Sequence, residues 1–204
     1  MSIVPDRLAT ALRGSLAPVV RGLHALGIGA NAVTVFGFLL TVLGAALLAM
    51  GQPAVALLTL LLGTLCDTLD GALARAAGGG TRFGSFLDST LDRLSDAALA
   101  IAAVQLGTSL PEPVLYVGGL ALLVASFLVP YIRAKAEALG EGAGVGVAPR
   151  EARVALYLIG VAAWAVTGLS SLFAATVAVA AFLATLTVIQ RFAHMAVALN
   201  EKKG

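Results

Sequence analysis

Apolar residues run along this chain in long stretches that short polar connections separate. Each stretch is long enough to cross a hydrocarbon core of about 30 Å as a helix that rises about 1.5 Å per residue. A helix is expected there because the core of a bilayer has no water to bond free backbone groups. The six predicted transmembrane helices cover residues 31–51, 53–77, 84–107, 113–139, 150–168 and 171–198.

A shorter segment precedes the first apolar stretch. Over residues 5–24, leucine and valine recur at helical spacing, and Arg7, Arg13 and Arg21 are among the polar positions. The pattern is typical of an amphipathic helix in the headgroup layer, although a frayed leader would also explain it. We therefore predict an all-α integral membrane protein, in which an N-terminal amphipathic interfacial helix precedes six transmembrane helices over residues 31–198. Residues 1–204 are predicted to form a single domain.

The composition agrees with a membrane protein. The 204 residues are 59% hydrophobic and 12% charged, with a mean hydropathy of +0.98. The charged share is about half that of an ordinary soluble domain, which excludes a soluble monomer. Nucleic acid is not an expected partner, because the net charge is only +2 and no basic run is interleaved with aromatic residues.

The basic residues lie on one side of the predicted membrane. The connections at residues 51–53, 107–113 and 168–170 contain no lysine or arginine, so all 13 basic residues fall on the opposite side. Such a bias marks the cytoplasmic side. The sequence therefore predicts a multi-pass protein of the cell (inner) membrane, with both termini and its polar face in the cytoplasm.

Four aspartates fall inside the predicted spans. Asp67 and Asp70 lie near the cytoplasmic end of the second span, and Asp88 and Asp92 lie early in the third. A charged group at the bilayer centre costs at least about 2.5 to 3.5 kcal/mol, so an acid at such a position suggests function. Spacings of three and four residues put each pair on one helical face. Because the connecting loop is short, we expect the two helices to be antiparallel neighbours and the four carboxylates to converge.

Four converging carboxylates repel one another unless positive charge lies between them. Oxygen ligands without a cluster of His or Cys favour hard cations, and four carboxylates can hold two of them. We therefore predict that Asp67, Asp70, Asp88 and Asp92 bind two divalent ions, Mg²⁺ or Mn²⁺. The alternative is structural pairing of these acids with Arg75, Arg82 and Arg93.

The acids stand in a longer pattern that includes small residues. Residues 67–92 read D-x2-D-G-x2-A-R-x8-G-x3-D-x3-D. This pattern resembles the signature of the CDP-alcohol phosphatidyltransferases, and the six-span layout is similar to that family as well. The resemblance implies transfer of a phosphatidyl group from CDP-diacylglycerol to a polar alcohol, with release of CMP, at a two-metal site. It also implies that Asp92 takes the proton of the attacking hydroxyl, and that the protein is a homodimer.

The same resemblance implies a pocket for the CDP-lipid. Its expected lining residues are Asn31, Thr34, Gly71, Ala74, Arg75, Thr81 and Gly84. Asn31 and Thr34 resemble the family's P-[ND]-x-x-T element, in which Ala30 replaces the usual proline.

Five further cations follow in the last three spans, and we expect them to bind an anionic acceptor, most naturally through its phosphate. They are Arg133, Lys135, Arg150, Arg153 and Arg191. Their setting resembles the branch of the family that makes phosphatidylinositol phosphate, which implies inositol phosphate as the acceptor. Pro130 departs from that branch, where a serine often stands. Each of these cations is also explained by anchoring of a basic side chain at the membrane surface.

Other functions remain open at this point. The same chemistry with glycerol 3-phosphate or another alcohol as acceptor fits the acids equally well, as does an archaeal-type CDP-lipid as donor. An interpretation from another class is a divalent-cation transporter that uses the acids as a transit site. The one-sided placement of the charged residues speaks against transport, which needs access from both faces.

Overall fold

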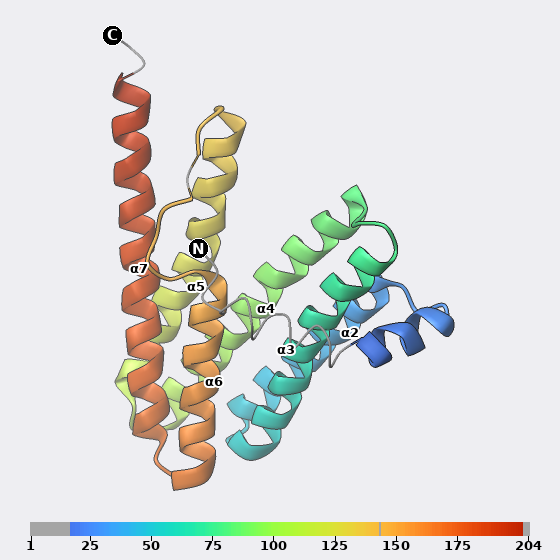
Figure 1. Cartoon of the computed structure of the whole chain (residues 1–204). Coiled ribbons are helices and arrows are strands. Elements are labelled where there is room, and N and C mark those ends of the chain that lie inside the picture. Colours follow the sequence, from blue (N-terminus) through green and yellow to red (C-terminus); the bar gives the residue numbers. More distant parts are fainter. Residues whose placement is uncertain (1–16, 143, 202–204) are drawn as a thin grey trace.

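The computed structural model describes residues 17–142 and 144–201, and these form an all-helical protein. Figure 1 shows how the helices are arranged. The long helices are α2 (Ala30–Ala49), α3 (Pro53–Ala76), α4 (Arg82–Ser109), α5 (Pro113–Ala138), α6 (Arg150–Thr167) and α7 (Ser170–Glu201). Each corresponds to one predicted stretch, and the bounds agree to within three residues.

The helix ends follow from residues that suit them. Pro53 and Pro113 occupy the first turns of α3 and α5, where the missing N–H of proline costs nothing. Thr81 caps α4, because its hydroxyl accepts a hydrogen bond from the N–H of Gly84 at 2.9 Å. Gly168 ends α6 with a φ of 74°, which a residue with a side chain rarely adopts.

The segment before α2 is described only in part. Residues 17–25 are helical. The remainder of the amphipathic helix predicted over 5–24 lies outside the described residues.

Four of the long helices are long and apolar enough to cross a membrane. They are α2, α3, α5 and residues 170–200 of α7. Charged residues distinguish the two other long helices: α4 contains Asp88, Asp92 and Asp96, and α6 opens with Arg150 and Arg153.

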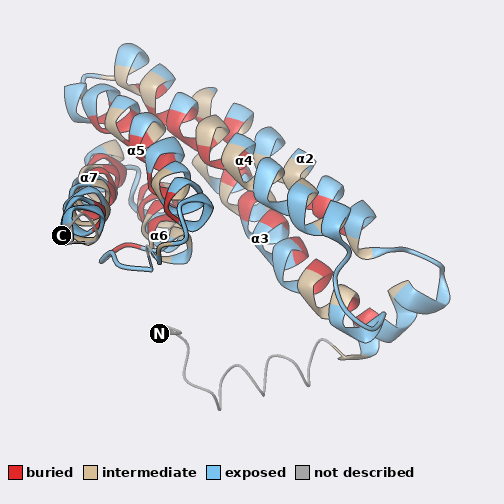
Figure 2. Ribbon diagram, turned by 90° about the horizontal axis from the view of Figure 1, so that it is seen from above, coloured by how far each residue is buried: buried red, intermediate tan, exposed pale blue. Residues whose placement is uncertain are grey.

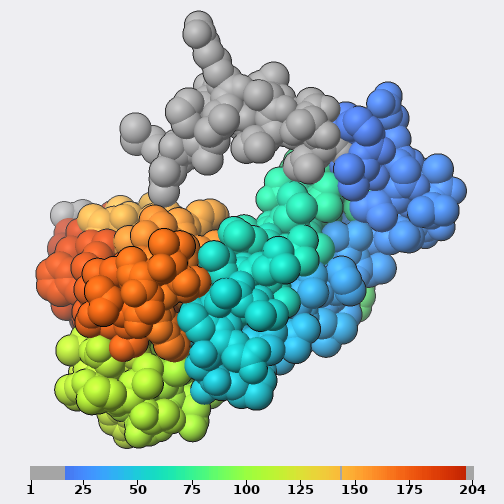
Figure 3. Space-filling view, turned by 90° about the horizontal axis from the view of Figure 1, so that it is seen from below, coloured from blue at the N-terminus to red at the C-terminus, as the bar shows by residue number. Residues whose placement is uncertain are grey.

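The six long helices pack side by side in a closed ring. Going round it, α2 packs on α3, α3 on α6, α6 on α7, α7 on α5, α5 on α4, and α4 on α2. Figure 3 shows the contact between α3, in teal, and α6, in orange, from the end where the short turns lie. The prediction that α3 and α4 are direct packing neighbours was wrong. They share α2 as a neighbour instead, which leaves a gap between their polar faces.

The apolar core fills the end of the ring that carries the short turns. Its fully buried members include Leu106, Leu115, Val161 and Phe173, and Trp164 stacks on Phe173 with ring centroids 6.1 Å apart. Figure 2 shows the buried residues on the inward faces of the helices. Burial of these side chains fixes the helices at one end, so the other end can hold polar groups.

Candidate functional site

A pocket of about 400 Å³ lies between α2, α3 and α4. Its lining contains six of the seven residues predicted to bind the CDP-lipid, together with two of the four acids. These are Asn31, Thr34, Gly71, Ala74, Thr81 and Gly84, with Asp70 and Asp88. The seventh residue, Arg75, lies at its edge, since its Nη1 is 3.4 Å from where a Cβ on Gly71 would stand. The structure therefore assembles this set from three separate helices.

The two glycines of the pocket differ in what surrounds them. A Cβ on Gly84 would lie 2.9 Å from Oδ1 of Asn31 and 3.1 Å from the hydroxyl oxygen of Thr81, so these side chains would have to move. A Cβ on Gly71 would meet only the flexible end of Arg75. The space beside Gly71 is therefore the more open of the two to a ligand.

Asp70 has a buried carboxylate oxygen without a partner. Its Oδ2 makes no hydrogen bond, although the residue is only 7% exposed. An unpaired buried oxygen of this kind costs free energy, and a cation bound beside it would remove that cost. Asp88 lines the same pocket and is exposed. The oxygen donors of this pocket therefore fit a hard divalent ion.

The other two acids are joined by an arginine. Nη1 of Arg150 lies 2.9 Å from Oδ1 of Asp92 and 3.5 Å from Oδ2 of Asp67. Within residues 17–142 and 144–201, no group of three or more His, Cys, Asp or Glu side chains is positioned to hold a metal ion. Asp88 lies near enough to Asp67, Asp70 and Asp92 for their charges to repel, and the guanidinium of Arg150 stands between Asp67 and Asp92.

Of the three arginines that the sequence offers as structural partners for the acids, only Arg93 forms such ion pairs among the described residues. Arg93 lies 3.6 Å from Asp92 and 3.7 Å from Asp96. Arg75 and Arg82 form no ion pair with any described residue. The arginine that contacts both α3 and α4 is Arg150, which the sequence placed in the acceptor pocket.

Asp96 is the site residue that sequence reasoning missed. It lies one helical turn after Asp92, is 8% exposed, and contacts Arg150 at 3.1 Å and Arg153 at 3.3 Å. The signal that could have found it is its spacing, because Asp88, Asp92 and Asp96 recur every four residues on one face of α4.

The cations predicted to bind the acceptor do not all have the same environment. Arg191 donates to the carbonyl oxygens of Val129 at 2.6 Å and Val145 at 2.9 Å, and it lies near enough to Arg133 and Arg153 for their charges to repel. Arg133 pairs with a neighbour on its own helix, Glu137, at 2.9 Å.

Lys135 is exposed on α5, the same helix as Arg133. Arg133, Arg153 and Arg191 thus form a cationic group drawn from α5, α6 and α7, in which Arg153 contacts Asp96 of α4. A group of like charges at one place favours a bound anion.

A sequence model of the CDP-alcohol phosphatidyltransferases matches residues 28–189, which include helices α2 to α6 and the first part of α7. The chain belongs to the CDP-alcohol phosphatidyltransferase family. It is therefore an enzyme of phosphatidyl transfer, and the family assignment decides against the divalent-cation transporter.

Two relatives of this phosphatidyltransferase are named as synthases of inositol phosphate lipids. The chain is 36% identical over 155 residues to the archaetidylinositol phosphate synthase of Pyrococcus horikoshii, which covers 76% of the chain and 80% of that protein. It is 36% identical over 162 residues to the phosphatidylinositol phosphate synthase of Mycobacterium tuberculosis, and this match covers 78% of the chain and 75% of that synthase.

Crystal structures of the Mycobacterium tuberculosis synthase have the same fold. The structure with CDP-DAG bound superposes with a TM-score of 0.79 at 32% identity and covers 86% of this chain and 90% of that one. A second structure of that synthase, in complex with manganese and citrate, has the same TM-score and identity and covers 86% of each chain.

Proposed function

We propose that this phosphatidyltransferase transfers the phosphatidyl group of CDP-diacylglycerol to inositol phosphate, forming phosphatidylinositol phosphate and CMP. The observation that carries the choice of acceptor is the group of Arg133, Arg153 and Arg191. Arg191 bonds to backbone carbonyl oxygens rather than to a carboxylate, and a phosphate on the acceptor would supply an anion for it. The names of the relatives support the same choice.

The donor is assigned to the pocket between α2, α3 and α4. Its volume of about 400 Å³ suits a nucleotide, and the open space beside Gly71 allows close approach to the backbone. The family's known preference for CDP-linked lipids, and the CDP-DAG bound to the solved relative, support this assignment.

Asp67, Asp70, Asp88 and Asp92 would hold two divalent ions, which supply positive charge for the diphosphate of the donor and for CMP as it leaves. The unpaired Oδ2 of Asp70 supports this assignment. The manganese in the solved relative supports it as well.

Asp92 is assigned as the general base because it borders both the acids and the arginines. The acceptor hydroxyl oxygen bonds to the lipid-linked phosphorus while the bond from that phosphorus to CMP breaks, and Asp92 takes the hydroxyl proton. Arg150, Arg153 and Arg191, with Arg133 and Lys135, would hold the acceptor phosphate.

The membrane arrangement follows from the fold and the charges. We propose that all six long helices span the cell membrane as a single domain, α4 and α6 included, because Arg150 and Arg153 of α6 pair with Asp92 and Asp96 of α4. Residues 5–24 would lie in the headgroup layer. The connections without lysine or arginine would face outward, so the site faces the cytoplasm. We also propose a homodimer, as the family resemblance implies.

The test is a panel of acceptors offered to the purified protein with CDP-diacylglycerol and Mn²⁺. We expect CMP release on addition of inositol phosphate, and Arg191→Ala should raise the KM for inositol phosphate at least tenfold while the KM for the CDP-lipid changes less than twofold. Arg21→Ala, which removes an exposed arginine outside both sites, is the matched control and should leave both values unchanged.

Two results would contradict the proposal. Equal or greater turnover with glycerol 3-phosphate would show that the acceptor is wrong. An archaeal-type CDP-lipid that is used in preference to CDP-diacylglycerol would show that the donor is wrong.

A further inference from the structure

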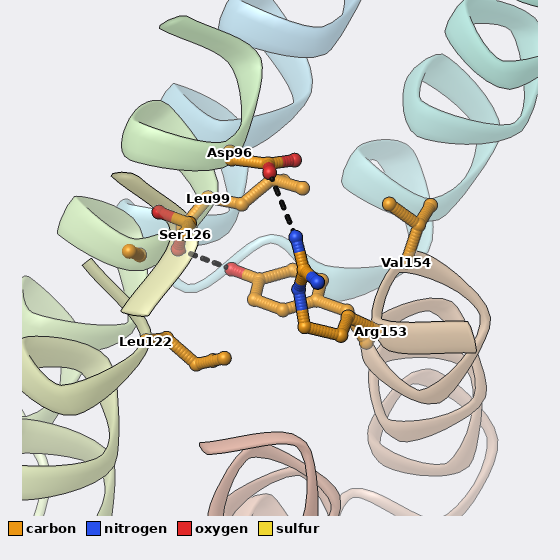
Figure 4. Close-up of a pocket in the computed structure, with 8 residues that line it drawn as sticks. Asp96, Leu99, Leu122, Ser126, Arg153 and Val154 are labelled. Carbon is orange, nitrogen blue, oxygen red and sulfur yellow. Dashed lines mark hydrogen bonds and ion pairs between the residues drawn. The ribbon is translucent and has the colours of Figure 1, made fainter. Parts of the chain in front are cut away.

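The carboxylate of Asp96 is surrounded by arginines. It lies 3.1 Å from Nε of Arg150, 3.3 Å from Nη2 of Arg153 and 3.7 Å from Nη1 of Arg93. Asp96 and Arg153 are both among the buried residues, at 8% and 6% exposure. Figure 4 shows the two side chains in direct contact, joined by a dashed line, in the lining of a small cavity. A buried carboxylate with three cationic partners is fully compensated, so it is held in one place.

The two arginines of α6 need this carboxylate. Arg150 and Arg153 lie in the first turn of the helix, where the positive end of the helix dipole disfavours cations. Arg153 is also repelled by Arg93 and Arg150. Without Asp96, Arg150 would keep only Asp67 and Asp92 as anionic partners, and its guanidinium would shift toward them.

Asp96 also joins two helices that lie across the ring from each other. The helices α4 and α6 are not among the closely packed pairs in the described part of the chain. A second bond joins them one turn deeper, where the hydroxyl of Tyr157 donates to the carbonyl oxygen of Leu99 at 2.8 Å. The two links between α4 and α6 differ in chemistry. The link through Asp96 involves arginines, whereas the link through Tyr157 is a hydrogen bond to a backbone carbonyl oxygen.

We infer that Asp96 is a positioning residue for the acceptor: it holds the guanidinium groups of Arg150 and Arg153 where they meet the acceptor phosphate. This inference rests on the proposed function. Arg153 uses Nη1 for the carbonyl oxygen of Ala148 and Nη2 for Asp96. A guanidinium has five N–H groups, so donors remain for a phosphate. The carboxylate of Asp96 contacts Arg93, Arg150 and Arg153, so its effect on the acceptor would pass through the arginines.

The test compares Asp96→Asn with Tyr157→Phe in steady-state kinetics and thermal unfolding in detergent. Asparagine keeps the size of the side chain but removes its charge, so the KM for inositol phosphate should rise at least tenfold while the KM for the CDP-lipid changes less than twofold. Tyr157→Phe removes the other link between α4 and α6, so it should lower the melting temperature and leave both KM values unchanged.

A purely structural role would give a different result. Asp96→Asn would then lower the melting temperature as Tyr157→Phe does, and the acceptor KM would stay within twofold of the wild type. Equal increases in the KM values of both substrates would also overturn the inference, because they would indicate a general disturbance of the site.

A double variant covers poor folding of the single one. In Asp96→Asn alone, the buried cation of Arg153 would face an uncharged asparagine. Adding Arg153→Gln removes that unpaired charge, so the folded double variant should be purified in better yield. If Asp96 acts through Arg153, the acceptor KM of the double variant lies within about twofold of that of Arg153→Gln alone. Multiplication of the two effects would show that Asp96 acts independently, against the inference.

A wrong acceptor would be recognised separately. If the wild type prefers glycerol 3-phosphate, the proposed function is wrong in its acceptor, and the Asp96→Asn comparison is made with glycerol 3-phosphate. It remains decisive because that acceptor also carries a phosphate.

Discussion

Replacement of Gly71 by alanine tests whether the pocket between α2, α3 and α4 holds the donor. The added methyl would lie 3.4 Å from Nη1 of Arg75, an ordinary contact with the end of a flexible side chain. Apart from the backbone of α3, no other atom of the described residues lies within 4 Å of it. Alanine is favoured over glycine inside a helix by about 1 kcal/mol, so the protein without substrate should be as stable as the wild type or more so.

The cost should appear only when the donor binds. An extra methyl in a filled site costs about 1 to 3 kcal/mol. At 1.4 kcal/mol per tenfold change, kcat/KM for the CDP-lipid should fall by about 5- to 150-fold. The assay is CMP release at saturating acceptor with varied CDP-lipid, together with thermal unfolding in detergent. The KM for the acceptor should not change.

Gly22→Ala is the matched control, because a Cβ on Gly22 has no atom within 4 Å and Gly22 does not line the pocket. It should change neither kcat/KM nor substrate binding. If Gly71→Ala leaves kcat/KM for the CDP-lipid within twofold of the wild type, the donor does not lie beside Gly71, and the reasoning from open space is refuted.

Two further predictions concern the metal and the packing of the ring. The guanidinium of Arg150 lies beside Asp67, where it would compete with a metal ion, and Arg150→Gln removes it. Mn²⁺ should then bind roughly tenfold more tightly, or by about 1.4 kcal/mol, as measured by electron paramagnetic resonance without substrates. Unchanged or weaker binding would show that Arg150 does not compete with the metal. Gly119→Ala would put a Cβ 2.8 Å from the backbone nitrogen of Val104. It should therefore destabilise the protein by about 1 to 3 kcal/mol in thermal unfolding, whereas Gly142→Ala, with no atom near its Cβ, should not.

In the proposed function, the acids and the arginines let one site accommodate two anionic substrates. The pocket assigned to the donor is lined by Asp70 and Asp88, whose negative charge needs cations before a diphosphate can enter. The region assigned to the acceptor already carries positive charge, because Arg153 and Arg191 lie near enough to repel each other. Arg150 contacts Asp67 and Asp92 and lies at the boundary between the two.

The sequence by itself determined the helices and indicated six residues that line the pocket between α2, α3 and α4. Long apolar stretches can form little else in a bilayer, and proline and glycine mark their ends, so α2 to α7 were predicted to within three residues. The spacing of Asp67, Asp70, Asp88 and Asp92 is a local property of two helices, and a pattern of small and acidic residues over 26 positions is specific enough to indicate a family.

Only the tertiary structure decided which helices are neighbours and which charges meet. Loop length suggested that α3 packs on α4, but side-chain packing closes the ring through α2 and leaves a pocket between them. The contacts of Arg150 and Arg153 with Asp96 join residues more than 50 positions apart. Periodicity within one helix carries no information about such partners, because they depend on how the helices are rotated and placed around the ring.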